Sequence, residues 1–463
     1  MHFRKYKDIS TVNASMKDLT IVGGGITGLS AAYFAAKSGL KVRVLEGSDS
    51  FGGLIKTFEV GNADLECFYH HFFLHDKELN WLIDELDLRS SLVNRKTTMG
   101  VYTNGRVFKF STLFDLLRFR PLNLFSKLRF VLCTIYLGKF SNWRTKEDIA
   151  ALDWFKKWSG KEVSESIWKP LLKVKFGKYS KVVPLAWMIG RLKQRFESRE
   201  SGSEKLLYLE GSLQVLLEAL LEKLKALDVE LITRAKVDDI LIDNNKVNGV
   251  VANERDFLSD KTLFTIPSNI INQVVLKHHT NFDLDNPNIE YFGAVCVILE
   301  LSESLSPVYW LNIADENSPF GGIIEHTHFI PPKSYDNRHV VYLSKYFSRD
   351  EEIAYQTNSE VEQVMLSYLN TIFPNFKEKN ILKTHVFRSN TAATVCDLNF
   401  SQKVPKVKSA IKDLFICNMA HVYPDERSVN NSIRIASNAC AVMGVNTDYV
   451  PVGSSLSGKI AFE

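Results

Sequence analysis

The sequence predicts an α/β fold in which a Rossmann-type nucleotide-binding domain is interleaved with an α+β substrate domain. Three observations support this prediction. An apolar run over 19–22 continues into a glycine-rich turn and a helical pattern, as in a strand, phosphate loop and helix. The stretch 96–204 is rich in bases and aromatic residues, and patterns typical of the first domain resume after it. At 463 residues the chain is long enough for two or three domains.

The glycine-rich turn has the G-x-G-x-x-G spacing, with Gly23, Gly25 and Gly28. The first glycine of this motif permits a tight turn, the second lets the backbone approach a pyrophosphate, and the third lets the helix pack on the strand. Glu46 ends the next apolar strand about 20 residues downstream, where an acidic residue accepts hydrogen bonds from a ribose. Because strand, helix and acid follow in this order, we predict a dinucleotide cradle.

A second glycine pair, Gly52 and Gly53, follows Glu46 after a short spacer. A pair in this position resembles the extra phosphate contact of flavoproteins of the glutathione-reductase-like group, and simple nicotinamide dehydrogenases lack it. The resemblance implies a glutathione-reductase-like Rossmann domain with FAD as the cofactor. No flavin-linking motif is evident, so we expect FAD to bind non-covalently.

Composition and charge exclude several classes of protein. The 57 Lys and Arg residues and 53 Asp and Glu residues leave a net charge of +4, too small to indicate nucleic acid as a partner. No apolar run reaches the ~18 residues of a membrane span, and the N-terminus lacks a signal-peptide pattern. We therefore expect a cytoplasmic protein with a polar leader over 1–18. The six scattered cysteines, without a C-x-x-C pattern, predict buried free thiols.

Apolar patterning and composition set the expected domain boundaries. Leucines over 213–224 trace a helix face, and two short apolar runs around Asn244 and Asn245 predict a hairpin. Apolar stretches over 294–301, 320–330 and 339–347 predict the strands of a substrate-domain sheet. We assign the FAD-binding domain to 1–95, 205–275 and 385–463, a helical insertion to 96–204, and the substrate sheet to 276–384.

The insertion is unusual in charge between 101 and 140, where seven bases and seven phenylalanines accompany one acid, Asp115. Further bases, among them Arg191 and Arg195, follow later in the insertion. A basic and aromatic amphipathic stretch either lies on an anionic membrane surface or receives a phosphorylated substrate, or it forms a solvated helical cap over a substrate pocket. We predict that the region from Val101 to Arg199 contributes positive charge to the substrate entrance, which the solvated-cap interpretation does not require.

The order of segments, the strand that ends at Pro267, and the closing strand and helix resemble the flavin amine oxidase and protoporphyrinogen oxidase-like superfamily. In that superfamily the last strand and helix bring backbone amides to the flavin ring, which implies contacts from Asn418, Met419 and the helix that begins at Val429. The usual Gly-Asp is replaced here by Asn418-Met419, and Leu54 stands where an arginine often follows the glycine pair.

Two further segments resemble subgroups of this superfamily. The stretch from Glu66 to Phe73 resembles the Gly-Pro-His-x-Phe stretch that lies against the flavin in protoporphyrinogen oxidases and UDP-galactopyranose mutases, with Tyr69 and His70 at the Pro and His positions. The segment from Tyr423 to Asn430 resembles oxidoreductases of bacterial surface-polysaccharide functions.

The predicted cofactor-binding and catalytic residues follow from these motifs. His70 and His71 are adjacent, so in a strand they would point to opposite faces and only one would face a pocket. In the later strand, His326 and His328 would lie on one face and Glu325 on the other. Each histidine is either a general base or a satisfied interior residue. No metal site is expected, because two histidines supply half a tetrahedral shell. The candidate catalytic residues are His70, His326 and His328, and the candidate FAD contacts are Gly23, Gly25, Gly28, Glu46, Gly52, Gly53, Val237, Asn418 and Met419.

The resemblance implies an FAD-dependent oxidoreductase that transfers a hydride from a substrate C–H bond to flavin N5, in surface-polysaccharide or lipid-linked precursor metabolism. The alternative is a UDP-galactopyranose mutase-like flavoenzyme that acts on a nucleotide- or lipid-linked sugar without net oxidation. A third hypothesis is a non-catalytic scaffold stabilised by FAD. The expected partner is a small-molecule substrate that is phosphorylated, nucleotide-linked or lipid-linked, with peripheral membrane contact through 101–140. The sequence does not choose the substrate or the electron acceptor.

Overall fold

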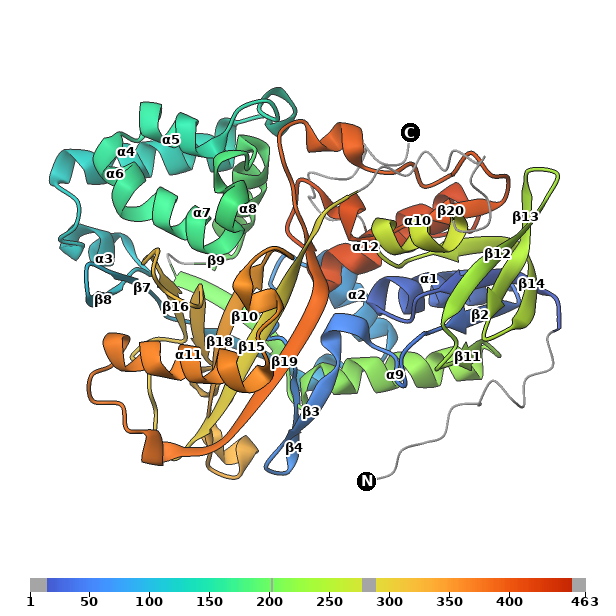
Figure 1. The fold of residues 1–463 in the computed structure, drawn as a ribbon, viewed down its shortest axis with the longest axis horizontal. Helices are drawn as coiled ribbons and strands as arrows, with labels where there is room; N and C mark the ends of the chain where they lie inside the picture. The colour runs from blue at the N-terminus through green and yellow to red at the C-terminus, as the bar shows by residue number, and fades with distance from the viewer. Residues whose placement is uncertain (1–14, 201–202, 277–288, 452–463) are drawn as a thin grey trace.

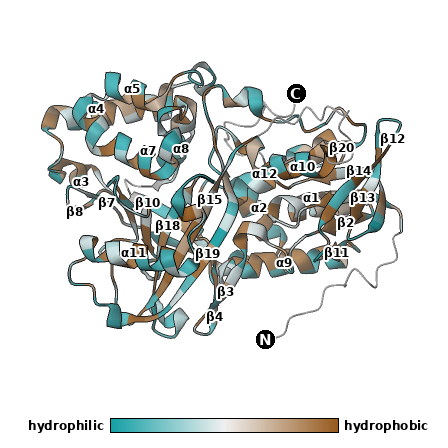
Figure 2. Ribbon diagram, in the orientation of Figure 1, coloured by the Kyte–Doolittle hydropathy of each residue, from teal (hydrophilic) through white to brown (hydrophobic). Residues whose placement is uncertain are grey.

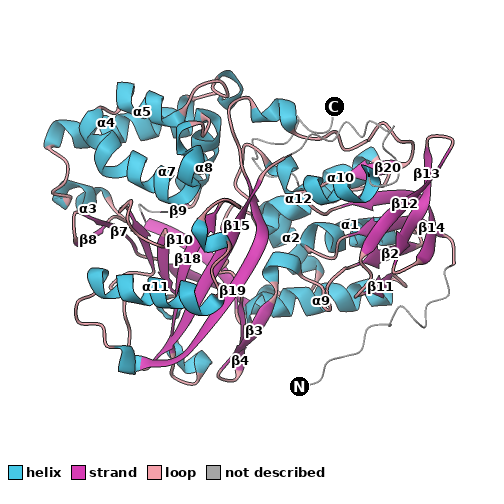
Figure 3. Cartoon of the chain, viewed as in Figure 1, coloured by secondary structure: helices cyan, strands magenta, loops and turns pink. Residues whose placement is uncertain are grey.

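The computed structural model describes residues 15–200, 203–276 and 289–451 (Figure 1). A sheet flanked by helices lies at the right of the view, and a second sheet at the left carries helix α11 (Asn358–Ile372). A group of helices, α3 to α8, lies above the second sheet, as the colouring by secondary structure shows most clearly (Figure 3). Three bodies of structure therefore meet near the centre of the molecule.

The first sheet has the strand order β11-β2-β1-β14-β13-β12, and β20 pairs with β14. β1 pairs in parallel with β2 and with β14, whereas β12, β13 and the first part of β14 form an antiparallel meander. Helix α1 (Ile26–Lys37) packs against α12 (Val429–Val442) beside this sheet. The strands are β1 (Lys17–Val22), β2 (Val42–Leu45), β11 (Glu230–Ile232), β12 (Val237–Asp243), β13 (Lys246–Ala252), β14 (Arg255–Phe264) and β20 (Leu414–Ile416).

The second sheet has the order β19-β15-β18-β17-β16-β7-β8. Strand β15, which lies between β19 and β18, is buried at every residue, as expected for a strand that is covered on both faces. The strands are β7 (Met99–Thr103), β8 (Arg106–Lys109), β15 (Tyr291–Leu301), β16 (Trp310–Ile313), β17 (Gly322–Glu325), β18 (His339–Phe347) and β19 (Ile381–Thr394).

Small strands and helices connect the two sheets. Helices α2 (Lys77–Glu85) and α9 (Ser212–Ala226) pack on the first sheet's side, and α10 (Ser268–Leu276) follows β14. The remaining strands are β3 (Thr57–Val60), β4 (Ala63–Glu66), β5 (Phe72–Phe73), β6 (Leu92–Lys96), β9 (Arg199–Glu200) and β10 (Ser203–Leu209).

The helical cap is formed by the helices between 113 and 197, and aromatic side chains make up much of its core. The rings of Phe155 and Trp168 stack with centroids 4.1 Å apart, and the ring of Phe130 also stacks with Trp168. Stacked aromatic pairs contribute beyond the apolar area that they bury. The helices are α3 (Leu113–Arg118), α4 (Leu124–Ile135), α5 (Ala151–Trp158), α6 (Lys161–Val163), α7 (Lys169–Phe176) and α8 (Leu185–Glu197).

The structure changes two expected boundaries. Residues 96–204 were assigned wholly to a helical insertion, but β7 and β8 belong to the second sheet, because β7 pairs in parallel with β16. The boundary expected at residue 385 falls inside β19, which pairs along its length with β15. The leader expected over 1–18 lies outside the described residues as far as residue 14, and 17–18 belong to β1. All six cysteines are buried free thiols, as predicted.

Candidate functional site

The glycine-rich turn lies at the carboxyl end of β1, where α1 begins. A Cβ atom on Gly28 would lie 2.0 Å from the carbonyl oxygen of Gly23, so the helix and the strand end approach too closely for any side chain. Gly25 differs, because a Cβ there would have no protein atom within 4 Å and its φ of −76° suits any residue. Protein packing does not explain a glycine at this position, whereas the close approach of a phosphate group does.

Gly25 also caps a helix whose first turn contains no acidic residue and whose N-terminus has no side-chain cap. The free N–H groups of such a helix end attract anions. The second glycine pair closes the site from the other side, since Gly52 donates its N–H to the Gly24 carbonyl oxygen at 2.9 Å. A Cβ on Gly53 would lie 3.3 Å from the Cα of Gly25. The two glycine segments therefore face one another.

Glu46 lies at the end of β2 beside this turn. One carboxylate oxygen accepts the Gly24 N–H at 2.8 Å, and the other accepts the Ser48 N–H and hydroxyl at 2.8 and 2.7 Å. These bonds fix the orientation of the carboxylate. The next segment contacts the same loop, because Ala235 donates to the Glu46 carbonyl oxygen, and Val237 packs in the cluster that contains Val22 and Leu45. The ribose contact of Glu46 and the cofactor contact of Val237 remain predictions.

Asn418 follows β20 and is almost fully buried. Its amide donates to the Ile266 carbonyl oxygen and to the Ser268 hydroxyl, and its side-chain oxygen accepts the Ala420 N–H. These bonds tie the end of β20 to the loop after β14. Met419 lies beside Asn418 and is partly buried against the core of the helical cap. The structure therefore gives Asn418 a structural role, and the flavin contacts of both residues stay predictions.

A cavity of about 270 Å³ lies where the three bodies of structure meet. Its walls come from the 69–73 segment, helices α7 and α8, strands β16 to β18, and the start of α12 at Val429. Aromatic rings form much of the lining, among them Tyr69, Trp187 and Trp310. A concave, largely apolar site with a few convergent polar groups is the usual form of a substrate pocket.

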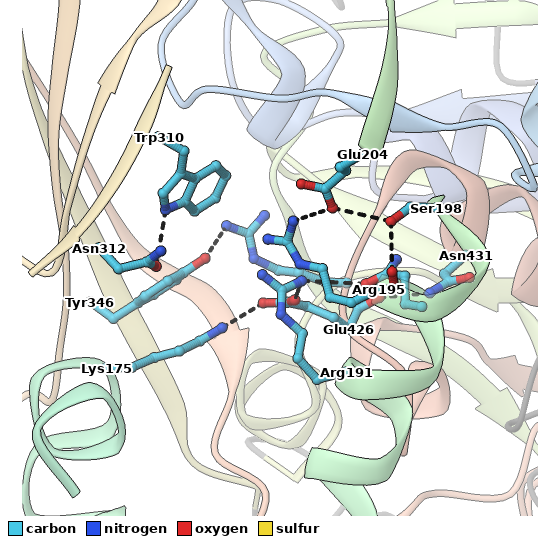
Figure 4. A network of polar contacts seen from close by, with 12 residues as sticks. Lys175, Arg191, Arg195, Ser198, Glu204, Trp310, Asn312, Tyr346, Glu426 and Asn431 are labelled. Atoms are coloured by element: carbon cyan, nitrogen blue, oxygen red, sulfur yellow. Dashed lines mark hydrogen bonds and ion pairs between the residues drawn. The ribbon is translucent and has the colours of Figure 1, made fainter. Parts of the chain in front are cut away.

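The charged side chains of the lining are Lys175, Arg191, Glu426 and Arg427. Lys175 Nζ lies 2.5 Å from one Glu426 oxygen, and Arg191 pairs with the other (Figure 4). Burial alone would raise the pKa of Glu426, but Arg191 and then Lys175 outweigh it and hold the pKa far below its ordinary value. Glu426 is therefore ionised, and the three cations of the lining exceed it by two charges.

Arg427 is the third cation of the lining. It donates from Nη2 to the Tyr346 hydroxyl at 2.6 Å. Among the described residues its buried Nε has no hydrogen-bond partner. A guanidinium with a free donor is suited to a carboxylate or phosphate ligand. A second pair, Arg195 and Glu204 at 2.5 Å, lies next to the cavity and is neutral in sum (Figure 4).

Both His70 and His71 line this cavity. The prediction that only one of them would face a pocket is wrong, because β4 ends at Glu66, β5 begins at Phe72, and the residues between them are not in a strand. His70 Nδ1 lies 2.5 Å from the Phe68 carbonyl oxygen. Since a carbonyl can only accept, Nδ1 carries the proton and Nε2 is left as an acceptor.

The cavity keeps both imidazoles neutral. Burial, then Arg427, lowers the pKa of His70 to about 4, and burial, then Arg195, lowers the pKa of His71 to about 3. A base with so low a pKa is poorly matched to proton abstraction at neutral pH. The neutral rings remain able to accept hydrogen bonds. We therefore expect His70 to orient the substrate and not to act as a base, and this role stays a prediction.

These pKa values predict a pH dependence of stability. The unfolded chain binds protons at these histidines below about pH 6.5, whereas the folded protein does not until about pH 4, so stability falls as the pH is lowered through this window. Each ring contributes at most about 1.4 kcal/mol per pH unit. We expect the fall in Tm between pH 7 and pH 5 to be smaller in a His71→Gln variant. An unchanged fall would show that His71 is not held neutral.

His326 and His328 do not line the cavity. The strand predicted over 320–330 is shorter, because β17 ends at Glu325 and a 3-10 turn over His326–His328 follows. His326 is buried, with Nε2 2.7 Å from the Tyr335 hydroxyl, and burial lowers its pKa to about 3. His328 Nε2 lies 2.6 Å from the Ser306 carbonyl oxygen. Their predicted shared strand face is absent, and each ring has a structural partner.

Sequence reasoning missed the roles of Glu426, Arg427 and Tyr346. A signal was present for the first two, since the acid and base stand together just before the α12 helix in a segment already singled out. Tyr346 gave no signal, because its side chain reaches the cavity only through the pairing of β18 with β15 and β17. The insertion contributes Arg191 to the lining through α8, and the prediction that its positive charge lies at the substrate entrance stays a prediction.

The sequence of the chain resembles those of known proteins. A family model described as flavin containing amine oxidoreductase matches residues 26–399. Coproporphyrinogen III oxidase of Bacillus subtilis (strain 168) is 29% identical over 174 residues, which are 34% of this chain and 36% of that protein. L-amino-acid oxidase of Echis ocellatus is 54% identical over 41 residues, 9% of this chain and 8% of that protein. The matched segments thus cover well under half of these curated relatives.

Solved structures resemble the whole chain. An oxidoreductase from Methanosarcina mazei has a TM-score of 0.72 at 16% identity and covers 92% of this chain and 100% of its own. A reduced UDP-galactopyranose mutase has a TM-score of 0.70 at 13% identity, and the match covers 94% of this chain and 95% of that protein. Cyclohexylamine oxidase from Brevibacterium oxydans IH-35A has a TM-score of 0.69 at 14% identity, and the match covers 93% of this chain and 99% of that protein. At these identities the likeness shows the fold alone.

The cradle fits the FAD that this family contains. The open space over Gly25, the uncapped start of α1, the facing glycine pair and the oriented Glu46 are what a bound dinucleotide requires. The family model covers most of the chain. The protein therefore belongs to the flavin-containing amine oxidoreductase family, and its cofactor is FAD.

Proposed function

We propose that this oxidoreductase acts on a substrate that carries an anionic group, and that Arg427, Arg191 and Lys175 bind that group. The observation that carries the proposal is the charge of the cavity, which three cations and one anion line while both histidines stay neutral. FAD, when bound, accepts the hydride from the substrate C–H bond. The chain supplies binding, orientation and exclusion of water.

The charge argues against a protonated amine as the substrate, although the family is named for amines. A cation in this cavity would be repelled by Arg427, and the one carboxylate, Glu426, is already paired with Lys175 and Arg191. A carboxylate or phosphate would instead satisfy the Arg427 Nε. Aromatic rings such as Tyr69 and Trp310 would cover the rest of the substrate and keep water away from the reacting bond.

The substrate classes inferred from the sequence agree with this requirement. Phosphorylated and nucleotide-linked molecules carry phosphate, and so do lipid-linked molecules whose linkage is a phosphate or pyrophosphate. The second candidate function, a sugar-nucleotide mutase reaction without net oxidation, is favoured by one observation. His70 and Tyr69, from the stretch that resembles the mutases, both line the cationic cavity.

The proposal is tested by anaerobic titration of the holoprotein with porphyrinogens, nucleotide sugars and primary amines while the flavin absorbance is recorded. We expect binding or reduction with the anionic ligands, and an Arg427→Gln variant should bind them about tenfold more weakly or worse, as expected when a hydrogen bond to a charged group is lost. The matched control is Lys193→Gln, a lysine of α8 that does not line the cavity.

Three outcomes separate the alternatives. Bleaching of the flavin by a substrate supports hydride transfer, whereas isomerisation of a nucleotide sugar only after reduction with dithionite supports the mutase reaction. Bleaching by amines at an unchanged rate in Arg427→Gln would contradict recognition of an anion.

A further inference from the structure

The helical cap exposes an apolar surface that its own packing does not explain. Nine large side chains between 113 and 140 are between 45% and 74% exposed, in α3, in α4 and in the π-helical segment η4 (Tyr136–Phe140). Monomeric proteins seldom leave such side chains side by side without a function. We name this surface the apolar face. It consists of Leu113, Phe114, Leu117, Leu124, Phe125, Leu128, Leu132, Tyr136 and Phe140.

The spacing places these side chains on one side of the helix. Leu124, Leu128, Leu132, Tyr136 and Phe140 follow one another at intervals of four, which stacks them along a single helical stripe. The opposite side of the same helix packs against the core of the cap through other residues, including Cys133 and Leu137. A helix that is apolar on both sides has a second apolar environment to contact.

The remaining exposed large apolar side chains do not form a comparable group. Outside the cap, in the described part of the chain, they include Tyr355, Val364 and Leu382, which belong to separate segments of the substrate domain. Helices α3 and α4 lie at the outer end of the molecule, far from the first sheet (Figure 1), and apolar and polar residues alternate along α4 (Figure 2).

The charges around the apolar face are almost all positive. Residues 113–140 include five bases and one acid, and that acid, Asp115, is held by the N-terminal cap of α3. Arg118 lies over the ring of Phe114 at 4.1 Å, and Arg129 lies 5.9 Å from the ring of Phe125. Basic side chains at the border of an apolar helix face complement the headgroups of anionic lipids.

We propose that the apolar face docks onto the surface of an anionic lipid bilayer, with α3 and α4 lying in the interface. Large apolar side chains enter the boundary between headgroups and acyl chains, and Arg118, Lys127 and Lys139 contact the headgroups. No helix among the described residues is long and apolar enough to cross a bilayer, so the contact is peripheral. The same cap supplies α7 and α8 to the cavity, so docking brings the cavity close to the lipid surface.

The test is co-sedimentation of the FAD-loaded protein with vesicles of phosphatidylcholine alone or with 30% phosphatidylglycerol, a composition set at about physiological anionic content. We expect binding to the anionic vesicles that weakens as salt is raised. A Leu124→Gln, Leu128→Gln, Leu132→Gln variant should lose roughly tenfold or more of that binding, because three large apolar side chains no longer enter the interface. These residues are exposed, so the fold and the bound FAD should be unchanged.

The matched control replaces equally exposed residues elsewhere, in a Tyr355→Gln, Val364→Gln, Leu382→Gln variant, which should bind vesicles as the wild type does. Wild-type protein that binds neither vesicle, or equal binding by both variants, would overturn the proposal. A concentration-dependent dimer that disappears only in the Leu124→Gln, Leu128→Gln, Leu132→Gln variant, without vesicle binding, would also overturn it and identify a second copy as the occupant. The docking does not depend on which substrate the cavity takes.

Discussion

A Gly25→Val variant is expected to fold normally and to be purified without FAD. No protein atom outside the adjacent residues lies within 4 Å of the Cβ position and the backbone there is ordinary, so a Cβ atom at this position meets neither a clash nor backbone strain. Its branched side chain would instead fill the space over the start of α1 that a phosphate needs. Losing two hydrogen bonds to a phosphate costs about 3 kcal/mol or more, so FAD affinity should fall at least about 100-fold.

The measurements are the flavin absorbance per protein and the Kd for added FAD, with circular dichroism to confirm the fold. Gly28→Ala is the informative comparison, because its Cβ would lie 2.0 Å from the Gly23 carbonyl oxygen. That variant should lose stability in the protein itself, with or without FAD. If Gly25→Val kept a full complement of FAD, the cradle would lie elsewhere.

Glu426→Ala is expected to destabilise the protein by about 2–4 kcal/mol, which should lower Tm by several degrees. Removing it leaves Lys175 and Arg191 without their counter-ion in a mostly buried site, and breaking a buried pair by removing one partner is the costly case. The side chain of Glu426 is 19% exposed, so we place the effect below that of a fully buried pair.

A double variant isolates the cause. Adding Arg191→Met to Glu426→Ala removes one uncompensated cation and should recover part of the lost Tm. Asp350→Ala serves as a control, because its pair with Lys178 is more than half exposed on both sides and should contribute nothing measurable. Equal losses from Glu426→Ala and Asp350→Ala would show that the charges of the cavity are solvated and would weaken its role as an anion site.

The cradle was predictable because its requirements are local. Gly23, Gly25 and Gly28 span the loop after β1 and the first turn of α1, and their spacing encodes contacts within this short segment and with a ligand. Glu46 and the second glycine pair come from the next strand and its loop, so few choices of topology were needed to place them. The predicted strands and helices around them are confirmed within a few residues.

The pocket was less predictable because its residues meet only through long-range pairing. His70 and His71 follow an apolar pattern that suggests a strand, yet the chain leaves β4 at Glu66 and both rings turn into the cavity. The run before His326 also suggests a continuing strand. There the Glu325 carboxylate accepts the backbone N–H groups of Leu305 and Ser306, and β17 stops. Alternation alone does not show where such tertiary contacts end a strand.

The charge of the cavity depends on three separate segments of the chain. Lys175 comes from α7, Arg191 from α8, and Glu426 with Arg427 from the loop before α12. The sequence showed an excess of bases in the insertion, but not that an acid more than 200 residues away would neutralise part of it. Only the fold shows which cation keeps a free donor.

The strand order of the first sheet affects how the chain folds while the ribosome synthesises it. β1 is made first, but its parallel neighbour β14 is made more than 200 residues later, and β20 closes the sheet only near residue 414. For most of synthesis the nascent chain therefore carries β1, α1 and β2 without the partner that covers their apolar edge, a state prone to aggregation. Contacts so distant in sequence also form slowly. Because FAD favours only the completed fold by mass action, its supply helps determine how much newly made chain reaches that state.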